Sequence, residues 1–324
     1  MSSSVTWPCA ALSDAELAPR TTMRVGGRAE WLLEPADPEE LRRAWVHARE
    51  QANHVRLLGG GANLIVEHGL HPGVVISTAR LRRVFRPDLA EEAMGGAPGE
   101  TLERGAPAQL VAWAGATLPS LVNAATRLGW TGLEGLVGVP GQLGGGLAMN
   151  AGGRWGDLWN VVESVRVLEE DGELVDLPRE RCNPRYRDGG LGSRVAVEAV
   201  LRLEVADPDE VRERAREYLL EKKRVQPVTE SSSGCIFKNP DRELSGGRSA
   251  GKLIEDCGCK GLARGDALVS PLHANFIVNR GRASAADVLG LIDDVRDRVA
   301  QRTGIDLATE VRIWRRLEEE SRRS

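Results

Sequence analysis

The sequence lacks the features of several protein classes. Its 324 residues contain no apolar run long enough to cross a bilayer. The first residues have no basic segment followed by an apolar core, so we expect neither a membrane span nor a secretory signal. A formal net charge of −4 argues against a general nucleic-acid binder. The cysteines are scattered and number 5, and this odd count favours a reducing cytoplasm over a disulfide framework.

Metal ligands and aromatic residues are also few. Cys257 and Cys259 lie close together, but no partner ligands accompany them at zinc spacing, so we expect no metal site. The sequence has 2 tyrosines, Tyr186 and Tyr218, and no internal repeat. Its length, with 41% hydrophobic and 28% charged residues, is typical of a globular protein of two or three domains.

Glycine is concentrated in one stretch, residues 132–153, in which Glu134 is the only charged residue. A flexible linker would be rich in polar residues, whereas leucine and valine alternate with the glycines here. Two interpretations remain open. The stretch is either a tight crossover between packed elements, or a loop around a large ligand whose phosphates accept backbone N–H groups.

A second glycine run, G-G-G-A-N at residues 59–63, lies between two predicted strands. The dinucleotide fingerprint of a Rossmann fold needs a helix directly after its glycines. Gly69 and Pro72 follow too soon for such a helix. The pattern therefore predicts a strand–turn–strand unit whose N–H groups can bind an anion.

Hydrophobic periodicity predicts mixed α and β structure with more hairpins than βαβ units. We expect a loosely held arm over residues 1–20, an exposed excursion over residues 86–107 and a solvated charge run over residues 222–224. Helices are predicted over residues 37–51, 118–128, 207–223 and 250–256 and from Ser284 onward, with Asp287 completing a capping box. Strands are predicted over residues 29–33, 54–58, 64–66, 74–77, 108–115, 161–168, 173–177, 195–205, 273–279 and 305–314.

Three polar residues stand in unusual places, and residue type alone leaves their roles open. Arg187 lies in a loop between predicted strands, where an arginine is usually solvated. Cys235 precedes an apolar pair and is either a small core residue or a functional thiol. Glu310 lies within a predicted strand, either on its solvent face or placed for chemistry.

The chain carries several long motifs in a fixed order, and together they are more specific than any single glycine run. They are T-M-R-V-G-G, L-G-G-G-A-N-L-I-V, G-L-E-G-L-V-G-V-P-G-Q-L-G-G-G-L-A-M-N-A-G, Y-R-D, Q-P-V-T-E-S-S-S-G-C-I-F-K-N-P, G-K-L-I-E-D-C-G-C-K-G, V-S-P-L-H-A-N-F-I-V-N and T-E-V-R-I. With these motifs the sequence resembles bacterial UDP-N-acetylenolpyruvoylglucosamine reductases over residues 21–313.

The resemblance implies an α+β fold. A two-part FAD-binding domain of the vanillyl-alcohol-oxidase type would span residues 21–206, with subdomains 21–72 and 73–206. A smaller α+β substrate-binding domain would span residues 207–304, and a closing strand and charged tail residues 305–324.

The implied cofactors are FAD and, as hydride donor, NADPH. We expect the FAD to be non-covalent, because the loop at residues 59–63 holds Ala62 and no histidine. The residues implied to contact FAD are Gly59, Gly60, Gly61, Ala62, Asn63, Gly115, Val139, Pro140, Gly141, Gly145, Gly146, Asn150 and Gly152.

The implied reaction is the reduction of UDP-N-acetylglucosamine enolpyruvate in peptidoglycan precursor synthesis. Arg187 and Glu310 would meet the charge that develops on the enolpyruvyl carboxylate. Cys235, which stands where the family usually has serine, would protonate the adjacent carbon. A thiol, with a reference pKa of roughly 8.5, donates a proton more readily than an alcohol, and it can also be oxidised. The resemblance implies substrate contacts for Tyr186, Lys223, Asn239, His273 and Arg312.

Two details refine the resemblance. The scarcity of tyrosine places the chain in the branch that lacks an additional tyrosine-bearing loop. Gly189 stands where the family often has serine. We expect a monomer that acts on a small-molecule substrate.

Two other functions compete with the reductase. One is a flavin-dependent sugar or alcohol oxidase on the same fold, which would leave Lys223, Asn239 and the combination of Cys235 with Glu310 unexplained. The other is a non-catalytic nucleotide-binding module, which would tolerate the loss of Arg187, Cys235 and Glu310.

Overall fold

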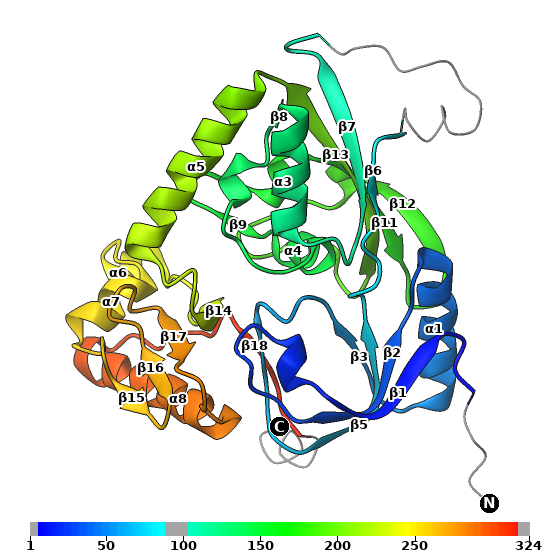
Figure 1. Ribbon diagram of the computed structural model, residues 1–324. Coiled ribbons are helices and arrows are strands. Elements are labelled where there is room, and N and C mark those ends of the chain that lie inside the picture. Colours follow the sequence, from blue (N-terminus) through cyan, green and yellow to red (C-terminus); the bar gives the residue numbers. More distant parts are fainter. Residues whose placement is uncertain (1–5, 88–102, 317–324) are drawn as a thin grey trace, which may run out of the picture. The chain divides into compact units, whose positions relative to one another are not determined.

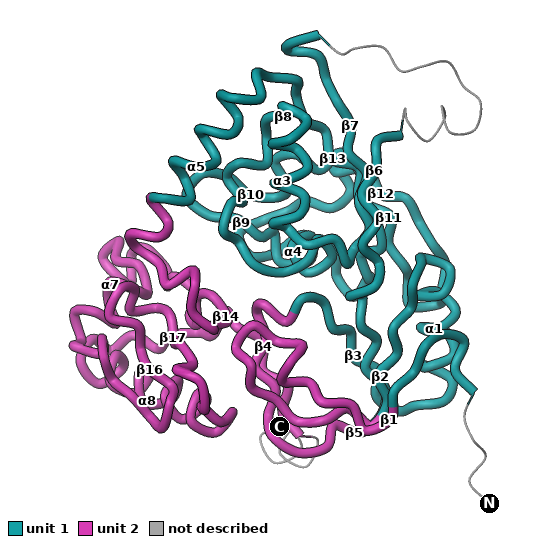
Figure 2. Tube along the Cα trace, viewed as in Figure 1, with its two compact units in different colours: residues 1–12, 31–60, 73–220 teal, residues 13–30, 61–72, 221–324 magenta. Residues whose placement is uncertain are grey.

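The computed structural model describes residues 6–87 and 103–316 (Figure 1). Most of the excursion predicted over residues 86–107 therefore lies outside the described residues. The chain forms two units, each assembled from separate stretches of sequence (Figure 2). Unit 1 combines residues 1–12, 31–60 and 73–220, and unit 2 combines residues 13–30, 61–72 and 221–324. The domain bounds given by the resemblance stay a prediction.

The largest sheet lies in unit 1 and has the order β12-β11-β13-β7-β6, with β8 also paired to β13. Its longest strand, β13 (Val195–Val205), alternates buried and exposed residues over much of its length and pairs antiparallel with β11 and β7. This confirms the strand predicted from the apolar alternation. The other strands are β6 (Val84–Phe85), β7 (Pro107–Trp113), β8 (Trp130–Thr131), β11 (Val162–Leu168) and β12 (Leu174–Pro178).

A second sheet has the order β1-β2-β5-β3, and three of its strands continue along the chain from one unit into the other. Its strands are β1 (Ala10–Glu16), β2 (Arg28–Glu34), β3 (Val55–Leu58) and β5 (Leu70–Ser77). The prediction of a loose arm is wrong over Ala10–Glu16. This strand is almost entirely exposed, so apolar alternation could not reveal it.

Helix α1 (Pro38–Gln51) begins as its local sequence predicts. The Asp37 carboxylate accepts a hydrogen bond from the Glu40 N–H at 2.8 Å, and Pro38 occupies the first turn. Leu41, Ala44 and Trp45 are buried on one face of the helix. They share a hydrophobic core with Val195 and other unit 1 residues.

The glycine-rich stretch is not wholly a loop. After α3 (Leu118–Leu128), which Gly129 ends at a φ of 69°, the chain forms two short helices, η2 (Glu134–Leu136) and α4 (Leu143–Met149). Each interior glycine costs a helix about 1 kcal/mol relative to alanine. Burial of Leu143 and Leu147, one turn apart, offsets that cost in α4.

Several further elements lie in one unit or the other. They are η1 (Ala18–Arg20), which lies in unit 2, and η3 (Leu158–Asn160), η4 (Arg179–Arg181), β9 (Gly152–Gly153), β10 (Gly156–Asp157) and most of α5 (Pro208–Val225), which lie in unit 1. Among residues 6–87 and 103–316, no helix is both long enough and apolar enough to cross a membrane.

Unit 2 is built on a sheet of order β14-β17-β16-β15. The strands are β14 (Ser231–Cys235), β15 (Ala263–Arg264), β16 (Ala267–Val269) and β17 (Phe276–Asn279). Strand β17 begins later than predicted, because residues 273–276 form a turn in which the Phe276 N–H donates to the His273 carbonyl. The helices are α6 (Arg242–Ser245), α7 (Ala250–Asp256) and α8 (Ala285–Thr303).

The C-terminal segment returns to the stretch of unit 2 that follows the glycine run at residues 59–63. Strand β18 (Arg312–Trp314) pairs parallel with β4 (Leu64–Val66). It is shorter than the strand predicted over residues 305–314. The alternating apolar residues Ile305 and Leu307 are buried, but they pack in the core without forming a strand ladder.

The capping box of α8 provides a test of local stability. The Ser284 hydroxyl accepts a hydrogen bond from the Asp287 N–H at 3.1 Å, and the Asp287 carboxylate accepts one from the Ser284 N–H at 2.9 Å. Ser284→Ala should lower the free energy of unfolding by about 1 kcal/mol, measured by urea denaturation. As a control, Arg212→Ala, which removes an exposed ion pair with Asp209, should change it by less than about 0.5 kcal/mol. Equal effects would contradict the assigned cap.

Candidate active site

Two glycine segments lie against each other in unit 1. A Cβ atom at Gly60 would come 3.0 Å from the Gly141 Cα, and one at Gly59 would lie 3.8 Å from the Gln142 Oε1. The Gln142 side chain is fixed by the Thr78 hydroxyl, which donates to its Oε1 at 2.9 Å. Gly145 is exposed, and a Cβ there would meet nothing within 4 Å. The result is a surface of bare backbone on which a ligand can lie close to N–H groups.

Two of the other predicted cofactor glycines, Gly115 and Gly152, are required by the protein itself, and a third, Gly146, is tightly packed. A Cβ at Gly115 would overlap the Thr78 carbonyl, and one at Gly152 would overlap Asp157 across the β9–β10 pair. At Gly146 it would lie 3.0 Å from the Leu158 side chain. Any contact of these residues with a cofactor would therefore have to come from their backbone.

Of the remaining predicted cofactor residues, Val139 is half-buried and packs against the unit 1 core, while Pro140 is exposed. Both lie in the segment that leads into Gly141.

Asn150, also predicted to contact the cofactor, holds another loop in place. Its backbone is left-handed, with a φ of 44°, and ends α4. Its side-chain amide donates to the Arg185 carbonyl at 3.0 Å, and its Oδ1 accepts from the Trp159 N–H at 3.4 Å. Both ends of the amide are thus engaged by the protein, and its donor end binds the loop that carries Arg187.

Arg187 lies at the tip of a tight turn. The Arg185 N–H donates to the Asp188 carbonyl at 2.7 Å, and the Asp188 N–H donates back at 3.2 Å. Arg187 has a φ of 56°, a left-handed conformation that costs a non-glycine residue roughly 1–2 kcal/mol. Its guanidinium lies 5.0 Å from the ring centroid of Tyr186, which is 58% exposed. Strain of this kind is concentrated at functional sites.

Gly189 supports the same turn. A Cβ there would overlap the Leu147 carbonyl oxygen. The serine that the family often has at this position would therefore not fit this loop as it is folded here.

Cys235 and Glu310 are brought together in unit 2. The Glu310 N–H donates to the Ile236 carbonyl, next to Cys235, at 2.7 Å. Phe237 and Thr309 form an isolated β-bridge, so the two segments run side by side. Arg187 belongs to unit 1, and the other two predicted catalytic residues belong to unit 2.

The second half of the glycine loop joins this network. The Asn63 side-chain amide donates to the Glu310 carbonyl at 3.1 Å. The Arg312 N–H donates to the Asn63 carbonyl at 3.0 Å. Gly61 has a φ of 61°, and a Cβ there would overlap the Arg20 carbonyl, so only glycine fits. Gly61, Ala62 and Asn63 are therefore fixed relative to Cys235 and Glu310.

Two of the predicted substrate residues accept hydrogen bonds from the protein's own backbone, and two others are exposed. The Asn239 Oδ1 accepts from the Ala250 N–H at 3.0 Å, at the start of α7. The His273 Nδ1 accepts from the Asn275 N–H at 3.2 Å, and burial lowers the pKa of His273. Lys223 and Arg312 are exposed.

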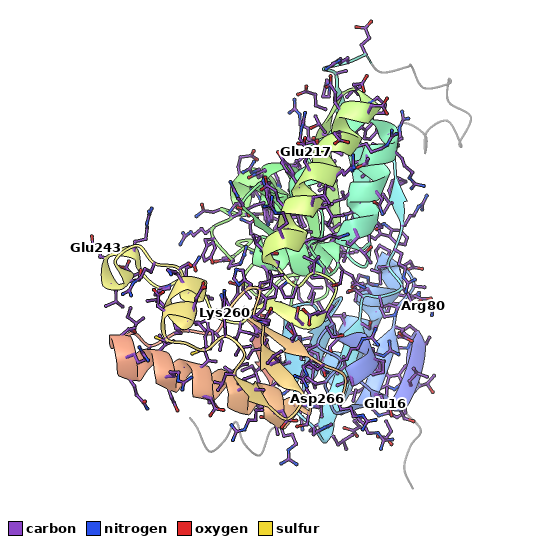
Figure 3. The ribbon with its side chains drawn as sticks, turned by 60° about the vertical axis from the view of Figure 1, so that its left-hand side comes forward. Glu16, Arg80, Glu217, Glu243, Lys260 and Asp266 are labelled. Atoms are coloured by element: carbon purple, nitrogen blue, oxygen red, sulfur yellow. The ribbon has the colours of Figure 1, made fainter. Side chains whose placement is uncertain are left out.

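Lys222 contradicts the expectation of a solvated charge run over residues 222–224. It is 4% exposed, and this burial lowers its pKa to about 8. Glu217 on the same helix is exposed (Figure 3). The signal was present in the sequence, because Lys222 continues the helical spacing of the buried Val211 and Ala215.

Metal binding finds no support in the described part of the chain, where no group of three or more His, Cys, Asp or Glu side chains is arranged around a common point. Cys257 and Cys259 are buried in the unit 2 core.

Two family models match the chain. A model described as FAD binding domain matches residues 29–178. A model described as UDP-N-acetylenolpyruvoylglucosamine reductase, C-terminal domain, matches residues 226–314. The predicted α+β fold with an FAD-binding domain is thereby confirmed.

Curated relatives and a solved structure match over most of the chain. The UDP-N-acetylenolpyruvoylglucosamine reductase of Desulforamulus reducens is 38% identical over 295 residues, which are 90% of each chain. That of Moorella thermoacetica is 37% identical over 94% of this chain and 93% of the relative. The crystal structure of the Thermus caldophilus reductase has a TM-score of 0.74 and 34% identity, covering 94% of this chain and 98% of that one. On these grounds the chain belongs to the UDP-N-acetylenolpyruvoylglucosamine reductases, a family of FAD-dependent oxidoreductases.

Proposed function

We propose that this chain reduces UDP-N-acetylglucosamine enolpyruvate to UDP-N-acetylmuramate, a step of peptidoglycan precursor synthesis, and that Arg187, Cys235 and Glu310 are its catalytic residues. The observation that supports this most directly is the Glu310 N–H to Ile236 carbonyl bond, which holds the backbone of Glu310 next to the segment that carries Cys235. Asn63, on the glycine loop, binds the same Glu310 backbone.

The residues present fit FAD as cofactor. The bare backbone at Gly59, Gly60 and Gly145 offers N–H groups that a pyrophosphate can approach without meeting side chains. When bound, FAD relays a hydride from NADPH to the enolpyruvyl methylene carbon. We propose that it is held non-covalently, since residues 59–63 contain no histidine.

The side chains have two tasks in this reaction. When hydride adds to the methylene carbon, the electron pair of the double bond moves to the adjacent carbon and its carboxylate. Arg187 and Glu310 meet the charge that develops there. The Cys235 S–H bond then breaks, its proton forms the new C–H bond of the lactyl group, and the thiolate regains a proton from water.

An anaerobic experiment distinguishes the reductase from its two rivals. The purified protein is reduced with NADPH, and the flavin spectrum is followed while UDP-N-acetylglucosamine enolpyruvate is added. Return of the oxidised spectrum without oxygen supports the reductase. A return only on admitting air favours an oxidase, and a chain without bound flavin favours a nucleotide-binding module.

We further propose a cytoplasmic monomer. All five cysteines are described, and no disulfide joins them, which suits a reducing compartment.

Replacing Cys235 separates the two half-reactions. Cys235→Ala should slow flavin reoxidation by the enolpyruvyl substrate by roughly 10²- to 10⁴-fold, because a general acid is lost. Flavin reduction by NADPH should barely change, and Cys235→Ser should keep much of the activity. Stopped-flow absorbance measures both rates. Equal slowing of both half-reactions would contradict the assignment of Cys235 as the proton donor.

Arg187 should show opposite effects on stability and rate. Arg187→Gly removes the cost of a left-handed arginine, so the free energy of unfolding should stay unchanged or rise by up to about 1 kcal/mol. Reoxidation by the substrate should slow by roughly 10²- to 10³-fold, since charge stabilisation is lost. Asn183→Gly is the matched control, because the exposed Asn183 has a φ of 45°. It should keep the wild-type rate, and a similar loss of rate there would assign the effect to the loop as a whole.

The cysteines should differ in reactivity. Cys182, Cys257 and Cys259 are buried, and burial raises the pKa of the half-buried Cys9 to about 11, so little thiolate forms there at neutral pH. Iodoacetamide at pH 7.5 should therefore alkylate Cys235 first, and the enolpyruvyl substrate should protect it. Peptide mass mapping identifies the modified residue. Preferential labelling of Cys9 would show that these environments do not control reactivity.

A further inference from the structure

The strand that ends in Cys235 contains a β-bulge. In the pairing of β14 with β17, Ser232 lies opposite Val278 and Cys235 opposite Phe276. Ser233 and Gly234 together therefore face one residue of β17. Gly234 has a φ of 72°, a conformation that favours glycine. Such bulges are frequent beside active sites, where they re-aim a side chain, and here the next side chain is Cys235.

Two hydroxyl groups anchor this bulge. The Thr22 hydroxyl donates to the Ser232 carbonyl at 2.6 Å, at the residue where the regular pairing ends. The buried Ser233 hydroxyl donates to the Leu64 carbonyl at 3.2 Å. The Thr22 N–H also donates to the Gly61 carbonyl at 3.1 Å. The Thr22 hydroxyl also lies 3.3 Å from the Gly61 carbonyl, so Thr22 binds the bulge through its side chain and the glycine loop through both its side chain and its backbone.

The turn that carries Thr22 is itself firmly held. The Thr21 hydroxyl donates to the Val25 carbonyl at 3.1 Å, and the Arg24 N–H donates to the Thr21 carbonyl at 3.2 Å. The buried Asn279 donates its side-chain amide to the Met23 carbonyl at 2.9 Å. The Met23 side chain is fully buried in the unit 2 core. Because these hydrogen bonds and the buried Met23 side chain hold the turn in place, the turn can fix the position of the bulge.

We propose that Thr22 is a positioning residue for proton transfer. Through the Ser232 carbonyl, its hydroxyl fixes the bulge and so the distance of the Cys235 thiol from residues 61–63 of the cofactor loop. This role rests on the proposed function of Cys235 as proton donor. A displacement of about 1 Å at a reacting group can slow a reaction by roughly 10²-fold, so one hydrogen bond to the bulge has a measurable effect on rate.

The test uses the FAD-loaded enzyme with Thr22→Val and Thr22→Ser. Valine keeps the shape and the N–H bond to Gly61 but lacks the hydroxyl and with it the 2.6 Å bond to Ser232 and the longer 3.3 Å contact with Gly61, whereas serine restores the hydroxyl. With Thr22→Val, flavin reoxidation by the enolpyruvyl substrate should slow by roughly 10- to 100-fold, while flavin reduction by NADPH stays within about threefold of wild type. Thr22→Ser should recover the wild-type reoxidation rate within about threefold. Thr126→Val, which removes a threonine hydroxyl bonded to the Val122 carbonyl in α3, should change neither rate.

A double-mutant cycle tests whether Thr22 acts through the thiol. In a Cys235→Ala background, Thr22→Val should cause little further loss, because the group that it positions is already gone. Losses that multiply in the double variant overturn the inference, as does a Thr22→Ser variant as slow as Thr22→Val. Flavin content and melting temperature are measured for each variant, and equal slowing of both half-reactions by Thr22→Val also overturns it.

A separate measurement distinguishes failure of the inference from failure of the proposed function. If Cys235→Ala leaves reoxidation unchanged, the proton-donor assignment falls. The positioning role is then judged by the rate of Cys235 alkylation by iodoacetamide without substrates. This rate should differ between Thr22→Val and wild type by at least about threefold and be restored by Thr22→Ser. An unchanged rate overturns the inference.

Discussion

The arrangement of Cys235 and Glu310 in unit 2 depends on one feature of the fold. The C-terminal segment returns and pairs with the strand that follows the glycine loop. The parallel pairing of β18 with β4 puts Arg312 opposite Leu64, immediately after the loop at residues 61–63. The Glu67 carboxylate secures this pairing by accepting from the Arg315 side chain at 2.9 Å and from the Arg316 N–H at 3.0 Å. Without this return, Glu310 would have no fixed position beside Cys235. The backbone of Glu310 is therefore held both by its own hydrogen bonds to Ile236 and Asn63 and by the strand pairing that follows it in the chain.

Glycine serves different purposes along the chain. At Gly145 the absence of a side chain leaves backbone exposed, and at Gly59 it leaves half-buried backbone uncovered. At Gly115 and Gly146 it lets buried segments approach each other, and α4 exists because that packing outweighs its low helix propensity. The packing interpretation of the glycine-rich stretch is supported at Gly146, and the interpretation as a ligand loop stays a prediction. A glycine count could not separate them.

Several polar side chains act through the backbone of other segments. The Asn150 amide holds the Arg185 carbonyl, Asn63 holds Glu310, and Thr22 holds Ser232. Each of these hydrogen bonds holds backbone at or near one of the proposed catalytic residues. Reacting groups must be held within fractions of an ångström, and hydrogen bonds to neighbouring backbone are a rigid means of doing so.

Local sequence was sufficient for the elements whose signals are short-range. Asp37 and Ser284 cap α1 and α8 as their patterns predict, Gly129 ends α3, and the alternation of β13 identifies it as a half-buried strand. The ordered motifs were also sufficient to identify the family. The capping, helix-end and alternation signals each lie within a few residues, and the motifs are read directly from their order in the chain, so the sequence alone determined them.

Tertiary structure decided what depends on distant partners. Strand β1 exists only by pairing in its sheet, and the bond from Thr22 to Ser232 joins residues 210 positions apart. The roles of Asn150 and of the bulge before Cys235 have no local signature, because their partners are chosen by the fold. Lys222 is an intermediate example. Its place on the buried face of the helix could be predicted from the sequence, but its burial depends on the packing of the folded chain.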